Sequence, residues 1–185
     1  MTFPAYQPPH YRPPGSIKVL GIINLVFAGL GLFGLLFTYS MYFGDDGSSS
    51  FGMRNPVIEV AHRSPEFMSF LRWSMVHGLF AAALLCVAGI GLIKYRPWGR
   101  SLAIFYALQN IVAAIVGLYL THKYLMAPLR ELHDPAADAG VTGGYMGGII
   151  AMAYPIVLLA FMFKRTVREH FARVAEPPVP PARAL

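Results

Sequence analysis

The sequence predicts an all-α membrane protein, a four-helix transmembrane bundle with both termini in the cytoplasm. Three observations lead to this prediction: four stretches without a charged side chain, a highly apolar composition, and basic residues that gather in alternate loops. The chain has 185 residues, of which 56% are hydrophobic and 13% are charged. This composition excludes an ordinary soluble domain, and the length allows one compact bundle with two short tails.

The four uncharged stretches are each long enough to cross a bilayer, because a hydrocarbon core of about 30 Å requires roughly 20 helical residues. They cover residues 19–43, 73–93, 101–121 and 141–163. With their flanking residues, the expected spans are about 19–43, 71–95, 101–122 and 141–163. We expect outer loops at 44–70 and 123–140, within a transmembrane domain of residues 17–165.

The distribution of basic residues predicts the orientation of the chain. The N-terminus, the 94–100 hairpin and the C-terminal tail together hold ten Lys and Arg residues, against five on the other side. Short loops rich in Lys and Arg remain in the cytoplasm, so both termini should lie there. The net charge of +6 then reflects topology and attraction to anionic lipid head groups. We therefore expect the lipid bilayer, and no nucleic acid, as a partner.

The first span follows a segment, residues 1–16, that contains five prolines and no apolar run. Proline removes backbone donors, which predicts an extended cytoplasmic tail that could also serve as a polyproline ligand. The apolar run of 25 residues after Lys18 exceeds the core of a signal peptide, so we expect no cleavage. Residues 166–185 are expected to form a second cytoplasmic tail, basic and rich in proline.

The second helix is expected to begin outside the bilayer. Ser64 is a suitable N-cap, Pro65 suits the first helical position, and Glu66 lies in the first turn, where a negative charge is favourable. A helix from Pro65 to Tyr95 would be about 45 Å long, so its first turns should project from the membrane.

The third and fourth spans are each expected to depart from a simple helix. The third should continue through Lys123 until Pro128 or Pro135 stops it. The fourth contains Pro155 near its middle, which predicts a kink because the carbonyl of Ala151 loses its hydrogen bond.

The hairpin Arg96-Pro97-Trp98-Gly99-Arg100 links the second and third spans. With the layout of four apolar helices from Lys18 to Arg165, this R-P-W-x-R motif resembles small bacterial four-span proteins of unknown activity. The resemblance implies a multi-pass protein of the cell membrane, which in a bacterium is the inner membrane. Residues 18–24 are similar to the first helix of animal CD20-like tetraspans. That family is expected to carry an outer-loop disulfide, which the single Cys86 cannot make.

Two further patterns concern helix packing. Residues 24–32 (NLVFAGLGL) match 110–118 (NIVAAIVGL), which indicates either two parallel hairpin repeats or a chance similarity of apolar segments. Small residues recur at helical spacing in every span, and residues 143–148 (GGYMGG) contain two overlapping G-x-x-x-G patterns. Such patterns allow helices to approach closely in lipid and predict a packed bundle.

Asn24, Gln109 and Asn110 are the candidate polar side chains within the membrane. Their amides are costly to leave unpaired in hydrocarbon, so they should face protein. One interpretation is hydrogen bonding between helices, and the other is a polar pathway or ligand pocket lined by Asn24 and Asn110. Acidic and basic side chains are absent from the depth of every span, so active ion transport is not expected.

The candidate metal ligands are the histidines of the outer side. His77 and His122 are predicted to lie at similar depths, with His62, His133 and several carboxylates on the same side. Imidazole and carboxylate groups suit zinc or another divalent ion, and two histidines can ligate haem. The alternative is that these histidines are solvated or hydrogen-bonded within the protein.

No sequence motif indicates catalysis. A phosphate-binding glycine loop, H-E-x-x-H and G-x-S-x-G are all absent from the sequence, so we expect no enzyme, no catalytic residue and no cofactor. The predicted function is that of an accessory, scaffold or regulatory protein, with a membrane-protein partner or a second copy of the chain. The alternative is a small-ligand protein, either channel-like or binding metal or haem through the outer histidines.

Overall fold

The computed structural model describes residues 15–43, 56–131 and 135–175, and within these ranges the chain forms helices and turns only. The four long helices are α1 (Gly15–Phe43), α3 (Pro65–Ile93), α4 (Pro97–Thr121) and α6 (Pro135–Met162). Shorter elements are α2 (Pro56–Arg63), the π-helical η1 (His122–Met126), α5 (Ala127–Glu131) and α7 (Arg165–Ala175). Four helices are long and apolar enough to span a membrane, which confirms the predicted all-α four-helix class.

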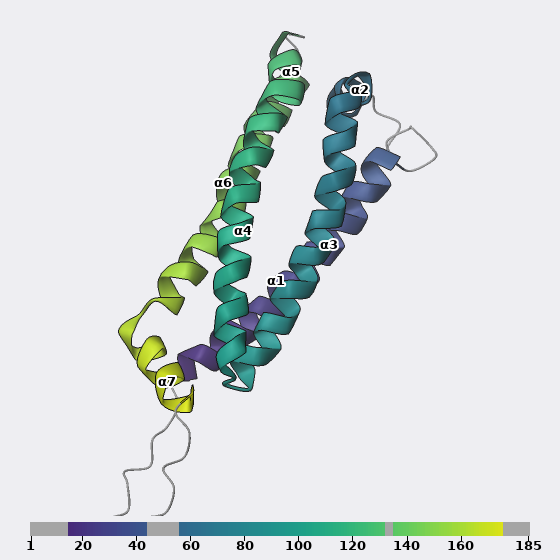
Figure 1. Ribbon diagram of the computed structural model, residues 1–185. Helices are drawn as coiled ribbons and strands as arrows, with labels where there is room; N and C mark the ends of the chain where they lie inside the picture. Colours follow the sequence, from purple (N-terminus) through teal and green to yellow (C-terminus); the bar gives the residue numbers. More distant parts are fainter. Residues whose placement is uncertain (1–14, 44–55, 132–134, 176–185) are drawn as a thin grey trace, which may run out of the picture.

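The long helices pack in chain order, with α1 against α3, α3 against α4, and α4 against α6. Figure 1 shows the start of α1, the turn between α3 and α4, and α7 at one end of the molecule. This end, named the hairpin end, is the one predicted to be cytoplasmic. The opposite end, named the loop end, holds α2 and α5. The predicted tail of residues 1–16 lies almost entirely outside the described residues, as do the last ten residues of the chain.

Helix α3 begins as predicted and ends earlier than predicted. The Ser64 hydroxyl accepts a hydrogen bond from the Phe67 amide at 3.3 Å, and Pro65 occupies the first helical position. At the other end, Tyr95 adopts a left-handed conformation with φ of 53°. The Tyr95 amide donates to Leu92 O and the Arg96 amide to Gly91 O, which is the Schellman pattern of a helix C-terminus. The helix therefore stops at Ile93, because Tyr95 leaves the helical conformation.

Helix α4 continues past the predicted end of its span, as expected. A π-helical segment, η1, follows Thr121, and α5 carries the helix through Pro128 to Glu131. Pro128 therefore does not end the helix. The π turn η1 lies just before it, and such turns commonly occur where the helical hydrogen-bond pattern is interrupted.

Two described helices were not predicted. Residues 56–63 were assigned to an outer loop, yet Pro56 opens α2 from the first position, where proline is tolerated. Residues 166–185 were assigned to a tail, yet α7 extends to Ala175. Val167, His170 and Phe171 are buried on one face of α7, and this spacing of three and four residues is that of an amphipathic helix. Helix α6 also begins at Pro135, before the predicted span at 141.

Buried apolar side chains form one cluster at each end of the molecule. The hairpin-end cluster joins all four long helices and α7, and the loop-end cluster joins α2, α3, η1, α5 and α6. The largest fully buried members at the hairpin end are Ile17, Leu85, Leu92, Leu158, Met162 and Val167. Between these clusters, α1 and α6 expose many large apolar side chains, as expected of surfaces that face lipid.

Glycines bring the backbones of three spanning helices into direct contact at the hairpin end. A Cβ atom on Gly89 of α3 would lie 2.8 Å from the carbonyl oxygen of Gly21 in α1. A Cβ on Gly99 of α4 would lie 2.5 Å from the carbonyl carbon of Gly91 in α3. These distances are too short for any side chain, so both crossings require glycine.

We predict that Gly89→Ala destabilises the bundle, because the new methyl group forces α1 away from α3. The expected loss is about 1–3 kcal/mol in free energy of unfolding. The matched control is Gly31→Ala in α1, where a Cβ would meet nothing within 4 Å. Alanine there should be neutral or stabilising, because it favours the helix. Unfolding in detergent micelles measures both, and equal stabilities for the two variants would contradict the close contact.

Candidate functional site

Asn24 is fully buried in α1, one turn from Leu20 and from Ala28 of the hairpin-end cluster. The Tyr154 hydroxyl donates a hydrogen bond to Asn24 Oδ1, which joins α1 to α6. The Tyr154 ring also stacks on Phe27, with ring centroids 4.1 Å apart. Asn24 Nδ2 is buried without a hydrogen-bond partner among the described residues. The predicted polar residue of span one therefore connects two helices that are far apart in the sequence.

Gln109 forms a second polar link, between α4 and α3. Its Nε2 atom lies 2.7 Å from His77 Nε2, and both side chains are partly buried. His77 is twelve residues from the start of α3, and Gln109 is twelve residues from the start of α4. Both side chains thus lie within the uncharged stretches of α3 and α4. Within the described part of the chain, Gln109 Oε1 has no hydrogen-bond partner.

Asn110 does not join Asn24. Its Nδ2 donates to the Tyr106 carbonyl oxygen of the same helix at 3.2 Å. The two asparagines that coincide in the proposed internal repeat thus make different contacts, one between helices and one within a helix. The parallel repeat itself stays a prediction.

His122 lies at the loop end, where its Nδ1 atom pairs with the Tyr145 hydroxyl. The guanidinium of Arg130 lies over the same tyrosine ring, 5.9 Å from its centroid. These contacts join η1 and α5 to α6. His62 is likewise engaged, with Nε2 3.0 Å from the carbonyl oxygen of Tyr42. His133 falls outside the described residues.

The structure does not bring the predicted metal pair together. His77 contacts Gln109, and His122 lies thirteen residues after Gln109 along one continuous helix. At about 1.5 Å per residue the two positions are roughly 20 Å apart along the axis. Among the described residues, no group of three or more His, Cys, Asp or Glu side chains is placed to hold a metal ion.

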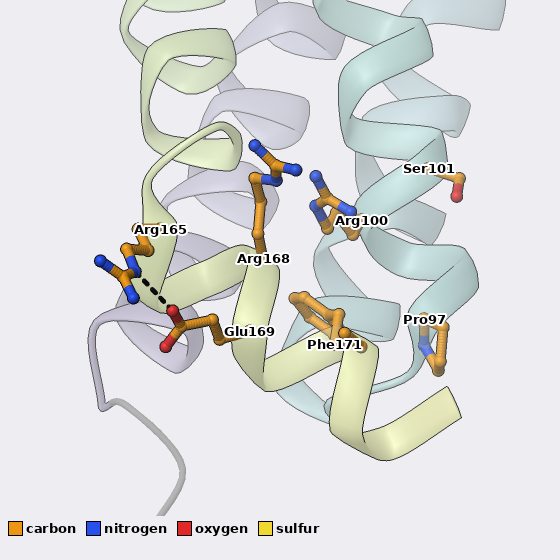
Figure 2. Close-up of a pocket in the computed structure, with 8 residues that line it drawn as sticks. Pro97, Arg100, Ser101, Arg165, Arg168, Glu169 and Phe171 are labelled. Carbon is orange, nitrogen blue, oxygen red and sulfur yellow. Dashed lines mark hydrogen bonds and ion pairs between the residues drawn. The ribbon is translucent and has the colours of Figure 1, made fainter. Parts of the chain in front are cut away.

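A pocket of about 670 Å³ opens at the hairpin end, between α7 and the start of α4. We name it the arginine pocket; its lining residues are Pro97, Arg100, Ser101, Arg165, Arg168, Glu169, Phe171 and Ala172. Figure 2 shows the guanidinium groups of Arg100 and Arg168 pointing toward each other. Arg165 is turned to Glu169, with 2.6 Å between Nε and Oε1. Arg100 Nε donates to the Met162 carbonyl oxygen at 3.3 Å, near the end of α6.

Sequence reasoning missed this pocket because it treated its members separately. Arg100 was interpreted as a topology signal in the hairpin, and Arg165 and Arg168 as parts of a tail. The spacing of Val167, His170 and Phe171 was the available signal for α7. Even with that helix predicted, its docking against the start of α4 could not be read from the sequence.

His170 fixes α7 to the turn between α3 and α4. Its side chain is buried, and its ring meets Tyr95 edge-on at 5.4 Å between centroids, and Phe171 at 5.1 Å. Burial disfavours the charged imidazolium and lowers the pKa of His170. The docked helix therefore contains a neutral imidazole at pH 7.

No family model, curated protein or solved structure matches this chain. Interpretation of these sites therefore depends on their geometry and chemistry.

We predict that His77 and Gln109 are energetically coupled. His77→Leu or Gln109→Leu alone leaves a buried polar partner behind, so each should lose about 0.5–2 kcal/mol of stability. The double variant leaves no unpaired polar group, so its loss of stability should be smaller than the sum of the two single losses. A double-mutant cycle on unfolding in micelles measures the coupling. Strictly additive losses would show that the contact does not contribute.

A second prediction concerns pH. Since the pKa of His170 is lower when α7 is docked, the undocked helix binds the proton more readily. Docking is therefore strongest above the free histidine pKa of about 6.5 and weakens as the pH falls through and below it. A nitroxide at Val174→Cys, in a Cys86→Ala background, should become more mobile between pH 7.5 and 5.5. His170→Leu should remove this pH dependence. If the mobility of the nitroxide still changes with pH in that variant, another titratable group is responsible.

Proposed function

We propose that this chain is a non-catalytic accessory or scaffold protein of the cell membrane that holds a transmembrane helix of a partner against α6. The four long apolar helices indicate an integral membrane protein with several spans. The resemblance of the hairpin to small bacterial four-span proteins supports the cell membrane as its location.

The observation that carries the proposal is an uncovered face of small residues on α6. A Cβ atom on Gly143 or Gly147 would meet nothing within 4 Å, and Ala151, one further turn along, is exposed. The neighbouring glycines of the same helix face side chains of η1 and α4. A Cβ on Gly144 would meet Met126, and one on Gly148 would meet Leu118. Of the two overlapping G-x-x-x-G patterns, one is thus used inside the protein and the other is free in the described structure.

Small residues matter on a surface that faces lipid. Apolar helices gain little from leaving lipid for each other, so association depends on close packing of backbones and on hydrogen bonds. Three small residues spaced by four form a shallow strip along α6, against which another helix can lie closely. A partner helix, from a second copy or another membrane protein, would complete the packing on this side.

We predict that Gly147→Leu weakens the association at least ten-fold, because the leucine fills the strip. Ala153→Leu is the matched control: it adds a large side chain at an exposed position about 120° around α6 from Gly147. Energy transfer between labelled copies in vesicles measures self-association, and native mass spectrometry of protein extracted from its own membrane measures a heteromeric complex. Equal behaviour of both variants and the wild type, in both measurements, would refute the proposal.

A second candidate function is binding of a small polar ligand inside the bundle. It is favoured by Asn24 Nδ2 and Gln109 Oε1, the two buried amide atoms without a hydrogen-bond partner among the described residues. The same mass spectra distinguish the candidates: a bound small molecule on a monomer supports the second, and a protein complex without one supports the first.

A further inference from the structure

We propose that the arginine pocket binds the phosphate group of an anionic phospholipid from the leaflet at the hairpin end. The inference is independent of the proposed function, because it concerns α4 and α7 and not the small-residue face of α6.

The arginine pocket is positively charged. Three arginines and one glutamate line it, which leaves a net charge of +2. Glu169 forms an ion pair with Arg165. Arg100 and Arg168 face each other across the pocket, and the positive charge of one acts on the other (Figure 2). Two like charges held together favour an anion between them.

The pocket also supplies hydrogen-bond donors. An arginine presents several N–H groups in a planar fork that matches the oxygens of a phosphate. Arg168 makes no hydrogen bond or ion pair within the described chain that would prevent this. Helix α4 adds the positive end of its dipole, because Pro97 occupies its first turn and Arg96 gives no side-chain cap.

The location of the pocket indicates the source of the phosphate. The pocket lies at the end of a spanning helix: the uncharged run of α4 begins at Ser101, one of its lining residues. Trp98 is 45% exposed beside it, and tryptophan favours the head-group layer. Phe171, Pro97 and Ala172 provide an apolar wall on which the glycerol and upper acyl chain of a lipid can lie. A lipid satisfies the charged and the apolar sides together, whereas a free phosphate satisfies only the first.

The position also agrees with the predicted orientation. The hairpin end is expected to be cytoplasmic, and the cytoplasmic leaflet is where anionic lipids attract basic segments. Helix α7 would then lie along the membrane surface with its buried face against the bundle and Arg168 toward the head groups.

Native mass spectrometry of the full chain in micelles tests the inference. The probes are phosphatidylglycerol and phosphatidylcholine with identical acyl chains. We expect phosphatidylglycerol adducts on the wild type and a roughly ten-fold weaker affinity for Arg168→Gln, the loss of one charge-assisted contact. The control Arg130→Gln removes the same charge at the loop end and should bind as the wild type does. Ser101→Asp, which places an anion in the pocket without removing an arginine, should also weaken binding.

Three outcomes would overturn the proposal. The first is equal binding of the two lipids by the wild type. The second is an equal loss for Arg168→Gln and Arg130→Gln, which would assign binding to overall charge. The third is displacement of the lipid by millimolar inorganic phosphate, which would identify a soluble phosphate compound as the natural ligand. Thermal unfolding of each variant shows that it is folded; Arg168 is exposed, so its substitution should leave the unfolding temperature unchanged.

Discussion

Direct contact between backbones at glycine is the interaction on which the rest of this structure depends. Lipid gives little reward for pairing apolar helices, so attraction must come from close packing. The Gly21–Gly89 crossing holds α1 to α3, and the Gly91–Gly99 crossing holds α3 to α4. The first crossing also determines the position of Asn24, because the Asn24 Cβ atom lies 3.1 Å from the position that a Cβ atom on Gly89 would occupy. The position of Asn24 is thus set by the glycine beside it.

The polar side chains in the membrane act as separate cross-links, and they do not form a continuous line. Asn24 connects α1 to α6 through Tyr154, whereas Gln109 connects α4 to α3 through His77. Asn110 uses its amide within its own helix. Each link removes a donor or acceptor from hydrocarbon, where an unpaired group would cost several kcal/mol. Their different partners and helices favour a role in holding the bundle over a polar pathway through it.

The sequence was sufficient for features that depend on local chemistry. Length and absence of charge predicted the four spans, and the Ser64-Pro65 pair predicted the start of α3. It was insufficient where tertiary contact decides. The end of α3 depends on the left-handed conformation of Tyr95, which is uncommon for a residue other than glycine. The contact of His77 with Gln109 could not be read from the sequence, because it joins two helices at positions 32 residues apart. Helix α7 has a readable pattern, yet its docking against α4 depends on contacts distant in sequence.

The basic side chains at the hairpin end have a defined arrangement in addition to their effect on membrane topology. The preference of Lys and Arg for the cytoplasmic side of the membrane depends on which side the cations occupy. It does not depend on the direction in which their side chains point. In the described chain Arg63 pairs with Glu59, and Arg165 with Glu169. The guanidinium groups of Arg100 and Arg168 instead point toward each other (Figure 2). Because α7 is fixed by the burial of Val167, His170 and Phe171, the packing itself maintains this convergence. The apolar core at this end therefore holds two like charges close together, an arrangement that suits an anion.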